Sequence, residues 1–181
     1  MHPHPLPSLD FRMGTAQDAS RVCVLGAQVF LEAYATGGIS RAVAQEVLEY
    51  FTVDRMTREL SYAAGVFILV ESRGNLIGFA QLDSSSPQPL APDGSTVELH
   101  RLYIHPRVTG IGLGTALLVQ AETWARSKSA ASVWATVWAE SKRALAFFSH
   151  RGYHDVGAGV YASSTEEYEN RVLVRVAQAE A

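Results

Sequence analysis

Apolar positions in the first third of the chain recur at helical spacing, and from residue 66 onward they form strand-like runs. Val22, Leu25 and Val29 lie on the apolar face of one predicted helix, whose other faces are polar. The first third is predicted to contain a strand over 11–13, a helix that begins after a capping box of Thr15 and Asp18 and stops at the glycines 37–38, a helix through Tyr50 capped by Ser40, and a helix over 54–64.

The rest of the chain alternates strands with two helices. Residues 66–71 and 76–82 flank a turn composition at 72–75, which predicts an antiparallel hairpin. The strand over 133–138 follows a helix, so it must run parallel to the strand over 97–104. This order predicts an α/β fold with a mixed sheet and helices on both faces. The further elements predicted are a surface loop over 84–95, a helix that extends to about Ser127, a helix between Ser141 and Gly152, and strands over 153–161 and 171–176.

Three glycines follow the fourth predicted strand. Gly110, Gly112 and Gly114 leave backbone N–H groups uncovered, and a helix begins after them, so the segment predicts a site for a phosphate or pyrophosphate. The alternative is a turn that only lets the helix pack close to the strand. A Walker loop needs a lysine where the chain has Thr115, and a Rossmann loop needs a later acidic residue, which 126–132 lacks.

Two motifs resemble those of the GCN5-related N-acetyltransferases, the GNAT family. Thr109-Gly-Ile-Gly-Leu-Gly114 is similar to the family's Gln/Arg-x-x-Gly-x-Gly/Ala loop, although Thr109 and Ile111 depart from its usual residues. Ser141-x-x-Ala144-x-x-Phe147-Phe148-x-x-x-Gly152-Tyr153 is similar to the pattern Asn-x-x-Ala-x-x-Phe-Tyr-x-x-x-Gly-Phe/Tyr. The resemblance runs from about residue 11 to residue 176. It is greatest to the bacterial spermidine/spermine N-acetyltransferase-like branch, over 98–104, 137–138 and 169–175.

The resemblance implies a fold and an activity. The implied fold is a mixed, mostly antiparallel sheet of about seven strands that splays between strands 4 and 5, in one N-acetyltransferase domain over 11–177 behind a flexible leader of residues 1–10. The implied activity is transfer of an acetyl group from acetyl-CoA, a cosubstrate, to a primary amine by direct attack in a ternary complex, with a polyamine or another small amine as acceptor. No metal is implied. The alternative is a catalytically weak CoA-binding sensor or interaction protein.

The resemblance also implies how the chain holds the cofactor. Backbone groups of the central strand would pair with the pantetheine arm, and the glycine loop would take the pyrophosphate. Arg107 or Arg143 would add charge-assisted contacts, although a surface arginine usually just faces water. The predicted cofactor-binding residues are Leu102, Tyr103, Ile104, Arg107, Thr109, Gly110, Ile111, Gly112, Leu113, Gly114, Thr115, Ser141, Arg143 and Phe148.

Acetyl transfer to an amine requires a base, because an alkylammonium with a pKa of ~10.4 is not a nucleophile while it is protonated. The resemblance implies that Glu98 is the base, because several family members use a glutamate at this position through an ordered water. His100 is predicted to share its strand face, where it could assist or substitute, because side chains alternate every two residues. The alternative is an ordinary polar patch of Glu98 with Arg101 or His100. A backbone N–H near Leu102 or Tyr103 is expected to polarise the acetyl oxygen.

Phe148 stands where the family usually has a tyrosine that protonates the departing thiolate. A phenyl ring cannot donate a proton, so we expect slower transfer, or an acid supplied by water or by Tyr103, Ser149 or Tyr153. Tyr103 is the third residue predicted to be catalytic, after Glu98 and His100. Ser141 in place of the family's asparagine removes an amide that would hold the cofactor.

The resemblance places the amine acceptor against the early helices. Glu32 and Tyr34 are the predicted substrate-binding residues, and Glu46, Glu49 and Tyr50 are further candidates. The alternative for each of them is an ordinary solvated helix face, which is the commoner role of such residues.

Composition narrows the partners and the compartment. The 181 residues are 48% hydrophobic with a formal net charge of -3, which suits one globular domain and argues against a general nucleic-acid binder. The single cysteine, Cys23, lies in an apolar helical pattern, which favours a reducing compartment. No stretch approaches the ~20 apolar residues of a membrane span, so we expect a cytoplasmic protein. His2 and His4 lie in a proline-rich leader and are not expected to bind a metal. A homodimer is left open.

Overall fold

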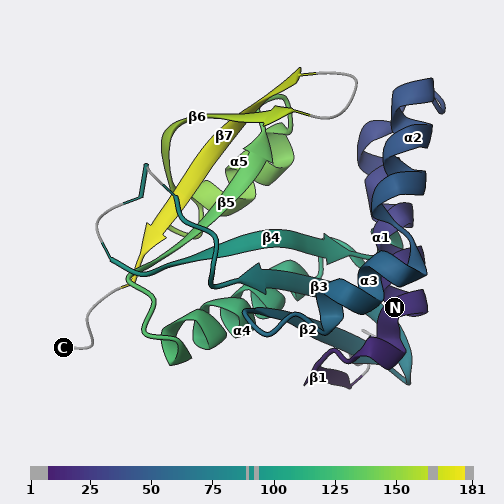
Figure 1. Ribbon diagram of the computed structural model, residues 1–181, viewed down its shortest axis with the longest axis horizontal. Coiled ribbons are helices and arrows are strands. Elements are labelled where there is room, and N and C mark those ends of the chain that lie inside the picture. The colour runs from purple at the N-terminus through teal and green to yellow at the C-terminus, as the bar shows by residue number, and fades with distance from the viewer. Residues whose placement is uncertain (1–7, 89, 92–93, 163–166, 178–181) are drawn as a thin grey trace, which may run out of the picture. The chain divides into compact units, whose positions relative to one another are not determined.

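The computed structural model describes residues 8–88, 90–91, 94–162 and 167–177, and their strands form one seven-stranded sheet in the order β1-β2-β3-β4-β5-β7-β6 (Figure 1). The chain forms two compact units, the first comprising Met1–Gln81 and Arg101–Val119, the second Leu82–His100 and Gln120–Ala181. The helices and strands are β1 (Leu9–Met13), α1 (Ala19–Tyr34), α2 (Arg41–Tyr50), α3 (Val53–Leu60), β2 (Gly65–Ser72), β3 (Asn75–Asp83), β4 (Thr96–Ile104), α4 (Leu113–Ser127), β5 (Ser132–Trp138), α5 (Lys142–Ser149), β6 (His154–Ala162) and β7 (Glu167–Val176), with short 3₁₀ turns at Ala16–Asp18 and Pro106–Val108.

The apolar core of the first unit lies between the early helices and the first strands. α1 packs against α2 and α3, as Figure 1 shows, and Val43, Phe51 and Met56 are buried together with Phe67 of β2. A Cβ atom on Gly26 of α1 would lie 2.6 Å from Cε1 of Phe51, so only glycine lets α1 pack this closely against the Phe51 ring.

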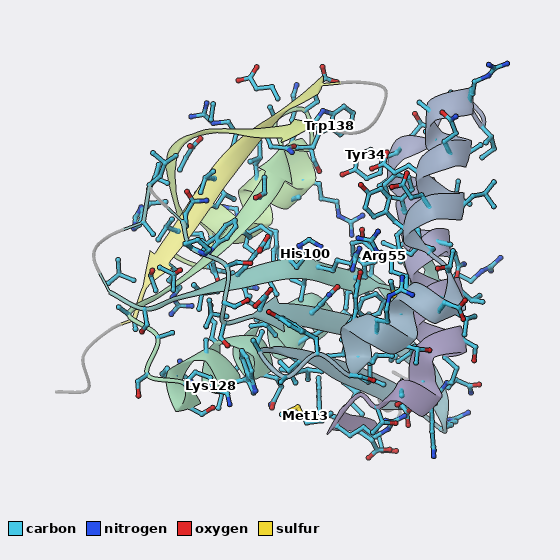
Figure 2. All side chains as sticks on the ribbon, viewed as in Figure 1. Met13, Tyr34, Arg55, His100, Lys128 and Trp138 are labelled. Carbon is cyan, nitrogen blue, oxygen red and sulfur yellow. The ribbon has the colours of Figure 1, made fainter. Side chains whose placement is uncertain are left out.

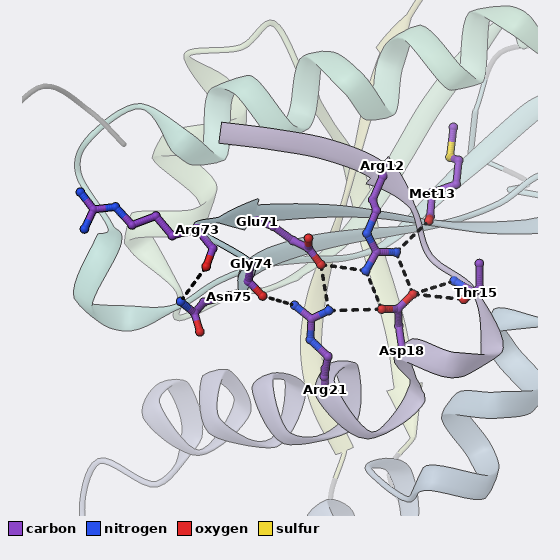
Figure 3. Close-up of polar contacts among 9 residues, drawn as sticks. All are labelled: Arg12, Met13, Thr15, Asp18, Arg21, Glu71, Arg73, Gly74 and Asn75. Atoms are coloured by element: carbon purple, nitrogen blue, oxygen red, sulfur yellow. Dashed lines mark hydrogen bonds and ion pairs between the residues drawn. The ribbon is translucent and has the colours of Figure 1, made fainter. Parts of the chain in front are cut away.

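A charged network ties β1, β2 and the start of α1 together within the first unit. Arg12 of β1 donates to Asp18 at 2.6 Å and to Glu71 of β2 at 2.7 Å, and Arg21 of α1 lies 2.9 Å from Glu71 (Figure 3). The backbone N–H of Thr15 donates to Asp18 at 3.0 Å, so the carboxylate half of the predicted capping box is present. The hydrogen bonds from Arg12 hold the pKa values of Asp18 and Glu71 below their usual range.

The core of the second unit is formed by β5, β7, β6 and α5. β5 pairs with β7 and β6 pairs with β7, both antiparallel. Glu122 of α4 is buried and accepts two bonds from Arg175 of β7, at 2.7 and 2.8 Å, and one from the Tyr153 hydroxyl at 3.2 Å. A buried carboxylate is unfavourable unless it is paired and hydrogen-bonded, so this cluster anchors the second half of α4 to β7.

β4 and β5 pair in parallel, and this pairing is short. Thr96 pairs with Ser132, Val97 with Val133 and Glu98 with Trp134, after which both strands continue without further pairing to one another. The predicted mixed sheet, with a parallel pair that splays between strands 4 and 5, is confirmed. The predicted helix over 54–64 was too long, because α3 ends at Leu60 and a turn carries the chain into β2.

The start of α2 agrees with the prediction, and the start of β1 differs from it by two residues. Ser40 caps α2, its side chain accepting from the Val43 N–H at 3.2 Å, as predicted. β1 begins at Leu9, two residues before the predicted strand, while His2 and His4 lie outside the described residues. No helix in the described part of the chain is long and apolar enough to cross a membrane.

Candidate active site

The glycine loop follows β4 directly. After Ile104 the chain makes a 3₁₀ turn at Pro106–Val108, then an exposed segment leads into α4. Gly110 and Gly112 have φ values of 83° and 85°, in the left-handed region that favours glycine. A Cβ atom on either would meet nothing within 4 Å, so the space beside the loop backbone is open. The glycines are required here by the backbone, not by close packing, and the open space leaves room for a diphosphate.

The N-terminus of α4 points its backbone donors into this loop. Leu113 is buried and holds the first turn in the core, while Gly112 O accepts the first helical hydrogen bond, from Ala116 N at 3.1 Å. The first N–H groups of a helix have no acceptor within the helix, and the helix dipole adds positive potential. Gly114 and Thr115 lie in this first turn. The segment therefore has the geometry of an anion site.

Other residues predicted to hold the cofactor lie at the surface or at a helix start. Arg107 and Arg143 are both exposed, and neither forms an ion pair with the residues that the structure describes. Ser141 occupies the N-cap position of α5, as predicted, but its hydroxyl makes no capping hydrogen bond. Its carbonyl accepts from Leu145 N at 3.0 Å. The hydroxyl is therefore not used by the helix.

Glu98 and His100 lie on one face of β4, as the strand period predicts. The Nδ1 atom of His100 lies 3.2 Å from Oε1 of Glu98. The Glu98 side chain is 16% exposed and the His100 side chain 41% exposed, and Figure 2 labels His100 on its strand. A half-buried carboxylate with an exposed imidazole beside it can accept a proton and pass it to solvent.

Arg101 does not join this polar pair. Its guanidinium is buried within the first unit, where Nη1 donates to Glu59 of α3 at 2.9 Å and also bonds to Gln81 of β3. Burial raises the pKa of Glu59, but the charge of Arg101 and hydrogen bonds from Arg55, Arg101 and Gln81 outweigh it and lower that pKa overall. The alternative of a surface patch of Glu98 with Arg101 is wrong.

The role of Glu59 as the partner of Arg101 was not predicted from the sequence. The one signal available was its spacing of four from Arg55 on α3, which predicts an ion pair, and the two are 2.8 Å apart. That spacing indicates a helix-surface pair and says nothing of a third partner on a strand far away in the sequence. Only the packed structure brings Arg101 to the same carboxylate.

Tyr103 lies on the strand positions that alternate with Glu98 and His100. Its ring packs 5.4 Å from that of Phe79, against the core of the first unit. Burial raises the pKa of Tyr103, although the charge and hydrogen bond of Arg101 oppose the shift. The phenol therefore stays protonated at neutral pH and is a weak acid. Leu102 and Ile104 are half-buried.

The residues considered as acids in the second unit have different surroundings. Phe148 is buried, with its ring edge-on to Tyr153 at 5.1 Å. Burial, followed by the charge of Glu122 and the hydrogen bond to it, raises the pKa of Tyr153 far above its usual range. That hydroxyl is already used by Glu122, so it is poorly suited to protonate a thiolate. Ser149 is exposed.

The candidates for the acceptor site lie on α1 and α2. Glu32 and Glu49 are exposed, and Tyr34 stacks on Phe30 with ring centroids 4.6 Å apart. Glu46 is half-buried, and its charge acts on Tyr103. The guanidinium of Arg55 lies 4.3 Å from the ring centre of Tyr50, so Tyr50 carries a cation on its face already. Glu32 and Tyr34 are the residues predicted to bind the substrate, and Glu46, Glu49 and Tyr50 are the further candidates.

Comparison with known proteins gives the family. Residues 37–153 match the Acetyltransferase (GNAT) family, and the chain therefore belongs to that family of acetyltransferases. The uncharacterized N-acetyltransferase in the pepI 3′ region of Lactobacillus delbrueckii subsp. lactis is 22% identical over 136 residues, covering 75% of this chain and 79% of that protein. An uncharacterized N-acetyltransferase of Mycobacterium tuberculosis is 23% identical over 158 residues, covering 87% of this chain and 97% of that one.

A solved structure has the same fold. The crystal structure of PaiA N-acetyltransferase from Thermoplasma acidophilum, in complex with coenzyme A, aligns with a TM-score of 0.73 at 18% identity, covering 94% of this chain and 99% of that chain. The predicted fold and the predicted class of enzyme, an acyltransferase, are confirmed.

Proposed function

We propose that this protein transfers the acetyl group of acetyl-CoA to a primary amine of a small molecule. The observation that carries the proposal is the exposed loop in which Gly110 and Gly112, both left-handed, lead into the N-terminus of α4. Backbone donors without helical acceptors, beside open space, suit a diphosphate. Family membership supports the same ligand.

Each part of the cofactor has its own proposed contacts. The loop from Thr109 to Thr115 would bind the diphosphate, with Arg107 and Arg143 as exposed cations for charge-assisted bonds. The backbone of β4 from Leu102 to Ile104 would pair with the pantetheine arm. The unused hydroxyl of Ser141 is a further proposed donor to the cofactor. Acetyl-CoA is a substrate in this scheme, and its acetyl group leaves with each turnover.

Glu98 is the proposed base. It would take a proton from the alkylammonium, directly or through a water molecule, so that the amine nitrogen can attack the thioester carbon. The carbon–nitrogen bond forms, the carbon–sulfur bond breaks, and the CoA thiolate accepts a proton. The half-buried position of Glu98 and its contact with His100 support this assignment, because the imidazole can return the proton to solvent.

The departing thiolate needs a proton that Phe148 cannot supply, because a phenyl ring has no acidic group. A thiol of pKa ~8.5 lies about 1.5 pH units above neutrality, or about 2 kcal/mol, so solvent can supply the proton at a modest cost in rate. Tyr103 stays a proposed acid, although its raised pKa makes it a weak one. The buried phenyl ring is also the observation that favours the second candidate, a CoA-binding GNAT protein with little transferase activity.

Among small-molecule amines, we propose a polyamine as the acceptor. Its support is the likeness of 98–104 and 169–175 to the spermidine/spermine branch and the carboxylates on α1 and α2, Glu32 and Glu46, which could meet ammonium groups. Tyr34 would add an aromatic face. Free CoA thiol released from acetyl-CoA with polyamines, aminoglycosides, amino acids or peptides should identify the acceptor. Saturable binding of acetyl-CoA with no thiol release from any amine would favour the second candidate.

The glycine loop can be tested against a matched turn elsewhere. Gly112 and Gly74 have φ values of 85° and 77°, and a Cβ atom on either would meet nothing within 4 Å. Gly112→Ala and Gly74→Ala should therefore each lose about 1 kcal/mol of unfolding free energy. Only Gly112→Ala should weaken acetyl-CoA binding, by about tenfold or more, measured by calorimetry. Equal affinities in the two variants would contradict the proposed diphosphate site.

A further inference from the structure

Trp134 of β5 is the register partner of Glu98, in the last pair of the ladder between β4 and β5. Residues directly opposite one another in a sheet project their side chains from the same face. The contacts of the indole agree, because it packs against Val174, its register partner on β7, and against Val172. Trp134 and Glu98 therefore lie side by side on one face of the second unit.

The indole of Trp134 carries a buried donor that is not used. The residue is 7% exposed, and its Nε1 atom has no hydrogen-bond partner among the described residues. The Oγ atom of Ser132, two residues earlier on the same face, is in the same state. Buried polar groups in native proteins are nearly always hydrogen-bonded, so each exception calls for an explanation. An indole N–H can only donate, so its partner must be an acceptor.

Glu98 supplies such an acceptor. Its Oε1 atom lies within hydrogen-bonding distance of His100, whereas its Oε2 atom forms no hydrogen bond or ion pair with the described residues. An ionised carboxylate only accepts hydrogen bonds, which makes Oε2 chemically complementary to the indole N–H. The neighbours on this face, Ser132, Val172 and Val174, do not titrate. His100 is the titratable group that the contacts place against Glu98.

We propose that Trp134 is a positioning residue for the base: its Nε1–H donates to Oε2 of Glu98 through one water molecule and holds the carboxylate charged and oriented toward the amine. The inference rests on the proposed function, because it takes Glu98 as the base. His100 then binds one carboxylate oxygen and Trp134 the other. Neither the catalytic carboxylate nor the buried donor is left without a partner.

Trp134→Phe tests the inference, because it keeps an aromatic ring and removes the N–H. We expect kcat to fall about tenfold and the acidic limb of the kcat profile to move to higher pH, since the carboxylate loses a donor. KM for acetyl-CoA should not change. Trp124→Phe is the control, because that indole lies on α4, with the Lys128 ammonium 5.3 Å from its ring centre. It should change neither kcat nor the profile, and measurements in a His100→Gln background remove the titration of the imidazole.

The wild-type enzyme provides a second readout that does not depend on a variant folding. The chain has three tryptophans, so the three indole N–H signals can be resolved by ¹⁵N nuclear magnetic resonance. The Trp134 signal should shift between pH 4 and pH 7 in the wild-type protein and should not shift in Glu98→Gln. A Trp134 signal that ignores pH, or a Trp134→Phe enzyme with an unchanged profile while Glu98→Gln is inactive, would overturn the inference alone. A fully active Glu98→Gln enzyme would instead remove the proposed base.

Discussion

Strand β4 takes part in two pairs of a carboxylate with a basic side chain, and the two differ in the hydrogen bonds that the carboxylate accepts. At Arg101 the guanidinium is buried, and Glu59, whose side chain is 21% exposed, accepts from Arg55, Gln81 and Arg101, so both of its oxygens are hydrogen-bonded. At Glu98 the side chain is 16% exposed, and the exposed His100 is the one hydrogen-bonding partner that its carboxylate has among the described residues. A saturated carboxylate stabilises the fold, whereas one with a free oxygen near solvent can accept a proton. The difference lies in the neighbours, not in the residue types.

The largest expected effect is on the rate, at Glu98. Glu98→Gln keeps the size of the side chain and a contact for His100 but removes the base, so kcat should fall about 10²–10⁴-fold, with acetyl-CoA still bound. The unfolding free energy should stay within about 0.5 kcal/mol of the wild type. Thiol release and urea denaturation measure the two quantities. Glu169→Gln, at a side chain 71% exposed on β7, is the control and should change neither.

A smaller effect, and on stability, is expected at Glu59. Glu59→Gln leaves the buried Arg101 guanidinium without its counter-charge, so the unfolding free energy should fall by about 3 kcal/mol. Urea denaturation measures this loss, and kcat per folded molecule should change little. A Glu59→Gln variant as stable as Glu169→Gln, or one that lost as much rate as Glu98→Gln, would contradict the difference between the two carboxylates.

The network of Asp18 gives the smallest effect and a dependence on pH. Hydrogen bonds from Arg12 lower the pKa of Asp18, so its stabilisation is complete above the ordinary range of an aspartate, about pH 4, and is lost as the pH falls below that range. Asp18→Asn should be about 2 kcal/mol less stable at pH 7. The difference from the wild type should close between about pH 4 and pH 2 in thermal or urea unfolding. A difference that persists unchanged at pH 2 would mean that the charge of Asp18 is not what stabilises β1 and α1.

Local sequence patterns predicted the elements of this protein well, for reasons seen at particular residues. Ser40 caps α2 because a serine hydroxyl reaches a backbone N–H three residues on, wherever the helix lies in the fold. Gly110 and Gly112 stand out in the sequence because few other residues accept a left-handed backbone. The end of α3 was missed, since the alanines before Gly65 do not themselves stop a helix.

The candidate site was predictable only in part. Glu98 and His100 share a face because of the strand period, which is a local property. The partners of Arg101 could not be predicted from the sequence, because Glu59 and Gln81 come from α3 and β3, about 40 and 20 residues earlier. The proximity of Trp134 to Glu98 depends on the register of a parallel pair, which no run of residues encodes by itself.

The amino-acid sequence alone determined the order of helices and strands, the glycine loop and the family, because periodicity, turn chemistry and spaced motifs act over a few residues. The tertiary structure decided which charged groups are buried, which carboxylate keeps a free oxygen, and which indole lies beside it. Burial and pairing depend on segments that are distant in the chain, and the free energy of a charge depends on those neighbours more than on its own position in the sequence.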